Sequence, residues 1–214
     1  MFNETWPWKR ELRRIARSLE EDRFELTKKL GKAVEESEVL YFVERDVMFG
    51  CFAVRRLLGM QSKVTKGIRK VKVAVTEYAK IEGMSSVDAS TVYGELEMYD
   101  YENAKSVRIS ANAMCNLFVH SYVFRFVWTC GGVDWDQWCR HAEDSVEADE
   151  LCGFLVASDE GVDQRLTFVS LEEIIRLFLV VADDEVVMLR MRRDRNGRMH
   201  ATGFGADEIE KRHL

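Results

Sequence analysis

Asn116 and His120 are the pair of residues in this chain whose types and spacing best suit chemistry. They lie four residues apart in the apolar run from Ser110 to Phe124. If this run is helical, side chains four apart share one face and can reach a common point. A histidine at such a point can take up and release a proton near neutral pH. We favour the structural alternative, in which both are hydrogen-bonded polar groups sealed inside a packed helix, with no cation beside the imidazole.

The core of this helix reads Met114-Cys-Asn-Leu-Phe-Val-His120. It resembles the signature helix of HEPN-domain proteins, in which an arginine, often followed by asparagine, precedes a histidine at about this spacing. The segment 43–58 is similar to the aromatic- and small-residue-rich core helices of that family. The resemblance covers residues 7–60 and 108–124.

The HEPN resemblance implies a ribonuclease of a toxin–antitoxin or defence system, or an inactive relative of one. In that family the arginine and histidine act on the RNA 2′-hydroxyl and the scissile phosphate, usually across a dimer. Cys115 stands where the family has arginine. A thiol supplies no fixed cation for the charge that grows on phosphate. A cation would have to come from elsewhere, and Arg108 lies too far upstream to share the helical face of His120.

A second group of residues has the chemistry of a zinc site. It consists of four soft ligands within 23 residues, namely Cys130, Cys139, His141 and Cys152. Zinc accepts a set of three cysteines and one histidine. Structural zinc sites usually contain closely paired ligands such as Cys-x-x-Cys, which this group lacks. Cysteine is also often buried for packing alone. We therefore expect no metal and no other cofactor.

Charge is distributed unevenly along the chain. Residues 1–80 carry 18 Lys and Arg against 12 Asp and Glu, whereas residues 81–214 carry 13 against 25. Basic residues gather on a predicted helix, on the segment that follows the second helix, and on a C-terminal hairpin. In the first two places the candidate binding residues are Arg10, Arg13, Arg14, Arg17, Lys66, Arg69 and Lys70. Such residues can neutralise phosphates, although the default interpretation of these stretches is a solvated helix and hairpin surface with no partner.

Trp135 and Trp138 lie in an acidic segment between Cys130 and Glu150. Exposed tryptophans among acidic residues would suit docking on a basic protein surface. In the alternative interpretation, this is an acidic loop whose tryptophans fold back on the core.

The elements predicted around these residues indicate an α+β protein. Thr5 and Pro7 suit the start of a long amphipathic helix. A second helix is expected over residues 38–58, followed by Gly59, so that the two form a helical hairpin. The alternation of residues 71–76 favours a strand, with a helix over 75–81 as the alternative.

The C-terminal part is predicted as two strands, a helix opened by the capping box Ser170-Leu-Glu-Glu173, and two strands joined at Asn196-Gly197. We expect these strands to form one antiparallel sheet covered by one helix. We predict that the chain forms either a mainly helical domain over 1–120 and a small α+β domain over 121–214, or one continuous domain.

The remaining features of the sequence limit the classes of function that are open to this protein. The N-terminal residues show no apolar run typical of a signal peptide, and charged residues interrupt the longest apolar stretch. We therefore expect a cytoplasmic protein with no membrane partner. Five cysteines at irregular spacing favour free thiols. No phosphate-binding loop, zinc-protease or hydrolase motif occurs. The sequence thus favours a non-enzymatic interaction or regulatory protein. We expect its partner to be a protein, or alternatively a nucleic acid bound at the basic N-terminal region. Self-association is also expected. The alternative is the HEPN-like ribonuclease or its inactive relative.

Overall fold

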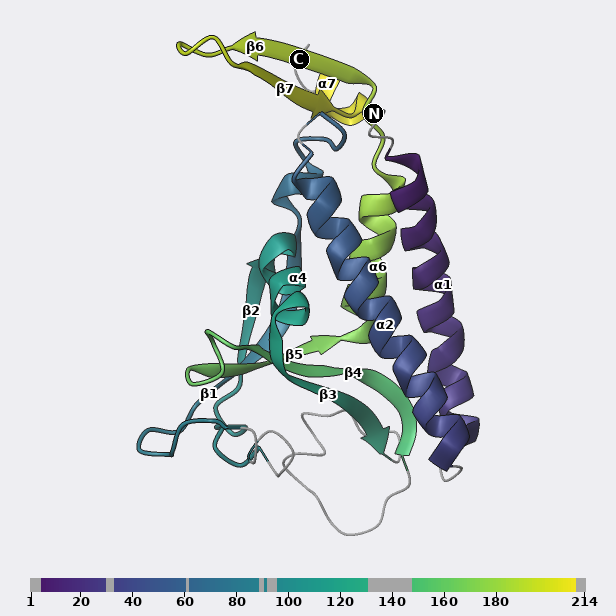
Figure 1. The fold of residues 1–214 in the computed structure, drawn as a ribbon, viewed down its shortest axis with the longest axis vertical. Coiled ribbons are helices and arrows are strands. Elements are labelled where there is room, and N and C mark those ends of the chain that lie inside the picture. Colours follow the sequence, from purple (N-terminus) through teal and green to yellow (C-terminus); the bar gives the residue numbers. More distant parts are fainter. Residues whose placement is uncertain are drawn as a thin grey trace.

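A computed structural model of the chain describes residues 5–29, 33–60, 62–88, 91, 96–130 and 148–210. These residues form helices packed on an antiparallel sheet, with a separate β-ribbon at one end (Figure 1). The predicted α+β class is confirmed. Among the described residues, no helix combines the length and the continuous apolar character that a bilayer crossing requires.

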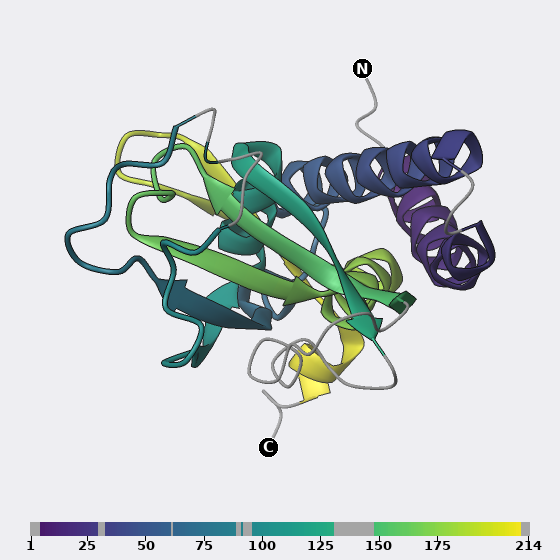
Figure 2. The same cartoon turned by 90° about the horizontal axis from the view of Figure 1, so that it is seen from below.

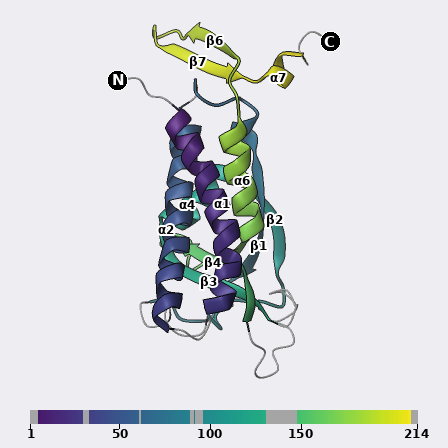
Figure 3. The same ribbon diagram turned by 90° about the vertical axis from the view of Figure 1, so that its right-hand side faces the viewer.

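The N-terminal helical hairpin consists of α1 (Trp6–Lys29) and α2 (Ala33–Leu58). The two helices lie side by side along the molecule (Figures 1 and 3). Proline in the first turn of α1 costs no hydrogen bond, because the first N–H groups of a helix lack partners in any case. The inner face of α1 buries leucine, isoleucine and alanine at helical spacing, at Leu12, Ile15, Ala16 and Leu19. The second helix starts earlier than predicted and ends as predicted, just before Gly59.

The main sheet has five antiparallel strands in the order β2-β1-β5-β4-β3. The strands are β1 (Lys72–Ala79), β2 (Lys105–Ser110), β3 (Ser121–Cys130), β4 (Ala148–Ser158) and β5 (Arg165–Ser170). The alternating pattern of residues 71–76 is thus a strand, and the helix alternative over 75–81 is wrong. Strands from both sides of residue 120 hydrogen-bond within this one sheet.

The sheet is buried on both faces. Helices α1, α2, α4 (Ala111–Val119) and α6 (Leu171–Asp183) cover one face (Figure 2). On β4, Phe154 and Val156 belong to the core beneath these helices, while Leu155 and Ala157 belong to a smaller core on the opposite face. Because strand side chains alternate between faces, a continuous apolar run is what a strand buried on both sides requires.

The last two strands, β6 (Met188–Arg193) and β7 (Met199–Phe204), form a two-stranded ribbon of their own, followed by α7 (Ala206–Glu210). The hairpin itself is confirmed, with Gly197 at φ 79° in its turn. The prediction that all C-terminal strands share one sheet is wrong. Helix α6 starts at the sheet and runs along the helical layer, so it delivers the chain to the far end of the molecule (Figures 1 and 3).

Candidate functional site

Helix α4 holds the predicted pair. The Ser110 hydroxyl caps its start by accepting a hydrogen bond from the backbone N–H of Ala113 at 3.1 Å. The helix ends at Val119, so His120 is the C-terminal cap, and its N–H donates to the carbonyl of Asn116 at 3.0 Å. Its own carbonyl accepts from the N–H of Asp159 at 3.2 Å. The backbone of His120 is therefore fixed on both sides while its side chain is left outside the helix.

The imidazole of His120 is exposed and lies beside a guanidinium. Nη1 of Arg55, in the last turn of α2, is 3.4 Å from Nε2 of His120. Guanidinium only donates hydrogen bonds, so the contact is a hydrogen bond when Nε2 carries no proton. The expectation of a sealed imidazole with no cation nearby is wrong. The pattern within one helix contained no signal for Arg55, which comes from a different helix.

Asn116 and Cys115 precede His120 on α4, and both are more deeply buried than its imidazole. The Oδ1 atom of Asn116 is buried and has no hydrogen-bond partner among the described residues. The thiol of Cys115 is fully buried against that of Cys51 on α2, and burial raises the pKa of Cys51 well above its ordinary value. Cys115 thus packs α4 against α2, and the cation beside the histidine is Arg55.

Arg108 does not contribute to this site. It lies on β2 opposite Ala74 of β1. Its charge, together with hydrogen bonds from Arg176 and from the N–H of Ala74, helps to lower the pKa of Glu173 at the start of α6. Arg108 therefore belongs to a separate cluster at the N-terminal end of that helix.

A strongly cationic surface forms at the end of the molecule that carries the ribbon. The backbone N–H of Lys66 donates to the carbonyl of Gly203 on β7 at 3.0 Å, and Thr65 forms a β-bridge with the same glycine. These contacts bring residues 62–70, which include no acidic residue, against the hairpin. We call this surface the cationic end and define it by Lys63, Lys66, Arg69, Lys70, Arg190, Arg192, Arg193, Arg195 and Arg198.

Most of the cationic end is open to solvent. All five of its hairpin arginines are exposed, as are Lys66 and Lys70. Nε of Arg69 is buried and has no hydrogen-bond partner among the described residues. The one acidic residue of the hairpin, Asp194, accepts hydrogen bonds from two turn N–H groups and from His200, which lower its pKa. The hairpin arginines therefore keep their charge available to a partner.

The arginines of α1 are mostly used within the fold. Arg13 pairs with Asp183 at 2.8 Å and also donates to the carbonyl of Ala182 at the end of α6. Arg14 pairs with Glu11 at 2.8 Å and with Asp46 at 3.3 Å, and the guanidinium of Arg10 lies over the ring of Trp6. Arg17 is exposed. Of these four arginines, Arg13 therefore joins α1 to α6 and Arg14 joins it to α2.

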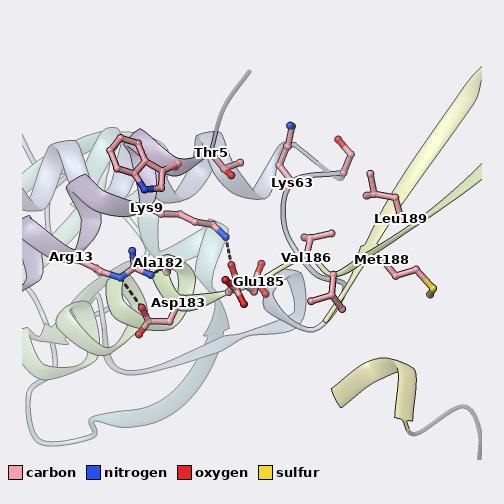
Figure 4. Close-up of a pocket in the computed structure, with 14 residues that line it drawn as sticks. Thr5, Lys9, Arg13, Lys63, Ala182, Asp183, Glu185, Val186, Met188 and Leu189 are labelled. Carbon is pink, nitrogen blue, oxygen red and sulfur yellow. Dashed lines mark hydrogen bonds and ion pairs between the residues drawn. The ribbon is translucent and has the colours of Figure 1, made fainter. Parts of the chain in front are cut away.

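A cleft of about 750 Å³ lies between α1, the end of α6 and the base of the ribbon. Lys9 and Arg13 reach across it from α1, while Val186, Met188 and Leu189 lie on the ribbon side (Figure 4). Lys9 donates to the carbonyl of Asp184, and burial lowers the pKa of this lysine.

The ribbon is joined to the body by a buried carboxylate. Asp184 follows α6 and accepts hydrogen bonds from the N–H and the hydroxyl of Thr65 at 2.9 and 2.6 Å. The same segment that bridges β7 is therefore also tied to the chain entering β6.

The remaining predicted residues lie mainly outside the described part of the chain. Trp135, Trp138, Cys139 and His141 are among them, and the side chain of Cys130 is not described either. The thiol of Cys152 is half-buried and donates to the carbonyl of Val127 at 3.2 Å. Within the residues that the structure describes, no group of three or more ligands could hold a metal ion.

No protein-family model, curated protein or solved structure matches the chain. The resemblance to HEPN proteins therefore stays a prediction.

Proposed function

We propose that this protein binds duplex DNA through the cationic end, as an interaction or regulatory protein and not as an enzyme. The observation that carries the proposal is that two basic segments, far apart in the sequence, are held together by Thr65, Lys66 and Gly203. A charge cluster assembled by the fold can contact several phosphates at once, which gives most of the affinity of a DNA-binding surface.

The shape of the ribbon supports this choice of partner. The major groove of B-form DNA admits a two-stranded β-ribbon, whereas that of A-form RNA is too narrow for side chains to read. The strand register places Arg190 opposite Thr202 and Arg192 opposite His200. These four hydrogen-bonding side chains share one face of the ribbon, because residues opposite each other point the same way. This polar face can enter a groove with Arg190 and Arg192 against the phosphates along its edges, while the lysines of residues 62–70 contact further phosphates.

We propose a cytoplasmic location for the protein. Cys51, Cys115 and Cys152 are free thiols, and the first two are in contact. A reducing compartment keeps such neighbours from oxidising.

The double substitution of Arg190 and Arg192 by serine tests the DNA proposal. We expect DNA affinity at physiological salt to fall about 10–50-fold, because each lost phosphate contact removes roughly 0.9 from the slope of log affinity against log salt. Fluorescence anisotropy with a random-sequence duplex across a salt series measures both quantities. We expect the slope to shrink by about 2 in the variant.

The matched control replaces Arg10 and Arg17 on α1 by serine, which removes the same charge from a different surface. Its affinity and slope should stay close to those of the wild type. Wild-type protein that does not bind DNA even at low salt would exclude the proposal and leave an acidic protein as the partner. Equal losses of DNA affinity in both variants would show that the binding is a non-specific attraction by net charge.

A second candidate function, RNA cleavage, is favoured by the 3.4 Å contact between Arg55 and His120. An exposed imidazole can accept the proton of an RNA 2′-hydroxyl, and the adjacent guanidinium can hold the phosphate that this hydroxyl attacks. The arrangement needs no metal ion. It also supplies the cation that the sequence lacks at Cys115.

Cleavage of single-stranded RNA by the wild type, His120→Ala and Arg55→Ala tests this candidate. It predicts that His120→Ala lowers the cleavage rate by about 10²–10⁴-fold. His200→Ala is the control, because His200 is equally an exposed histidine but lies on the ribbon. Cleavage that survives in His120→Ala comes from a contaminant, and a wild type without cleavage removes the candidate.

A further inference from the structure

The ribbon has a second face, and its residues form a self-complementary pattern. Five alternating positions run from an acid through three apolar residues to a base, namely Glu185, Val187, Leu189, Met191 and Arg193. All five are exposed. The N–H of Val187 donates to the carbonyl of Phe204 at 3.0 Å, so the extended pairing continues below β6. Alternate residues of an extended chain share a face, and this is the face opposite Arg190 and Arg192.

The apolar part of this face has little cover from its own chain. Val187, Leu189 and Met191 are 56%, 47% and 65% exposed, and Met199 of β7 on the same face is 56% exposed. A two-stranded ribbon alone is marginally stable in water. A row of exposed apolar side chains on such a ribbon indicates a surface that another molecule covers.

We propose that a second copy of this chain covers the face. The two ribbons pack face to face, in antiparallel directions, about a two-fold axis at Leu189. In this arrangement Leu189 meets Leu189 of the second copy, Met191 meets Val187, and Arg193 meets Glu185. The Leu189 contact lies on the axis and the other two contacts each occur twice, as an isologous interface requires. The proposal does not depend on DNA binding: of the cationic end it uses Arg193 alone, whereas Arg190 and Arg192, which the DNA test removes, lie on the opposite face.

Charge decides the direction of packing. Arg193 lies at the tip of the ribbon and Glu185 at its base, and neither has an ion pair within the described part of its own chain. Antiparallel packing forms two oppositely charged pairs, whereas parallel packing would place both tip arginines together. An acidic partner of another kind would prefer the arginine face and would leave the apolar face open.

The cleft beside the ribbon base leaves room for the tip of the second copy. Its walls include Glu185, Val187, Leu189 and the 61% exposed side chain of Trp6. Figure 4 shows Glu185 and Leu189 on the ribbon side of this cleft. The lining also carries Lys9, Arg13 and Lys63 from the body, beside the carboxylates of Asp183 and Glu185. The cleft therefore offers apolar side chains to Met191 of the second copy and, at Glu185, a carboxylate to its Arg193.

The size of the face predicts a reversible dimer. Nine extended residues on paired strands about 4.8 Å apart bury roughly 600 Å² in total, below the 1,200 Å² or more of stable interfaces. Association should therefore depend on concentration in the micromolar range and above.

Sedimentation velocity of the full chain over a concentration series tests the proposal. The wild type should shift from monomer to dimer, and Met191→Asp should weaken dimerisation at least about tenfold, because it buries a charge against Val187. Thr202→Asp adds the same charge on the opposite face and should dimerise like the wild type. Circular dichroism confirms that both variants stay folded. A wild type that is monomeric throughout, or a dimer indifferent to Met191→Asp, would overturn the proposal.

A charge exchange tests the antiparallel direction. Arg193→Glu and Glu185→Arg should each weaken dimerisation about tenfold, because like charges then face each other. The double variant restores both pairs and should dimerise nearly as well as the wild type. A double variant as weak as the single ones would show that the ribbons do not pack tip to base.

Discussion

Phe154→Ala is expected to lower the free energy of unfolding by about 3–5 kcal/mol. Phe154 lies on β4 and is fully buried. Its ring centroid is 5.9 Å from that of Phe118 on α4, and 5.2 and 5.5 Å from those of Phe124 and Phe126 on β3. Truncation leaves a cavity that the surrounding elements can close only in part, and it removes three aromatic contacts. It should also loosen the helix that carries His120.

Urea denaturation measures this loss as a lower midpoint at an unchanged slope. Tyr122→Ala is the control, because Tyr122 lies on the same sheet but is 41% exposed. Its effect should stay below about 1 kcal/mol. If the two variants lose the same stability, the ring cluster is not the centre of the core.

The parts of the fold that are determined by residues close together in the sequence could be predicted. Ser170 caps α6 by accepting from the N–H of Glu173 at 3.2 Å, as the capping box predicts. Asn196-Gly197 turns the ribbon. Both signals act within four residues, so they need no knowledge of the rest of the chain.

The order of strands was not predictable in the same way. β1 pairs with β5, which follows it by almost ninety residues, and no local pattern records that partner. β6 and β7 are separate from the five-stranded sheet because of the direction in which α6 leaves that sheet. That direction depends on packing against α1, which the apolar stripe of α6 permits but does not specify.

The candidate site was likewise predictable only where it depends on residues close together in the sequence. Periodicity placed Asn116 and His120 on one face of a helix, but it did not show that the helix ends at Val119 and leaves the imidazole outside. Arg55 lies 65 residues from His120 in the sequence. It reaches the histidine because the small thiols of Cys51 and Cys115 allow α2 and α4 to approach closely. Cys115 therefore has a packing role that the sequence alone could not assign.

Gly50→Ala is expected to lower the free energy of unfolding by about 2 kcal/mol. Gly50 lies in α2, where alanine would normally stabilise a helix by about 1 kcal/mol. Here a Cβ atom would lie 2.3 Å from two ring carbons of Phe178 on α6, a fully buried residue. Because the ring is fully buried, it can move aside only by displacing the core side chains around it, or α2 and α6 must separate. This overpacking outweighs the gain in helix propensity.

Thermal or urea unfolding measures the loss, and a second substitution identifies its cause. Phe178→Leu removes the ring, so the double variant Gly50→Ala/Phe178→Leu should lose less stability than the sum of the two single variants. Gly59→Ala is the matched control, because its Cβ would meet only the carbonyl oxygens of Arg55 and Arg56, at an ordinary 3.4 and 3.6 Å. Its stability should stay within about 0.5 kcal/mol of the wild type. Strict additivity in the double variant would mean that Gly50 does not set the distance between α2 and α6.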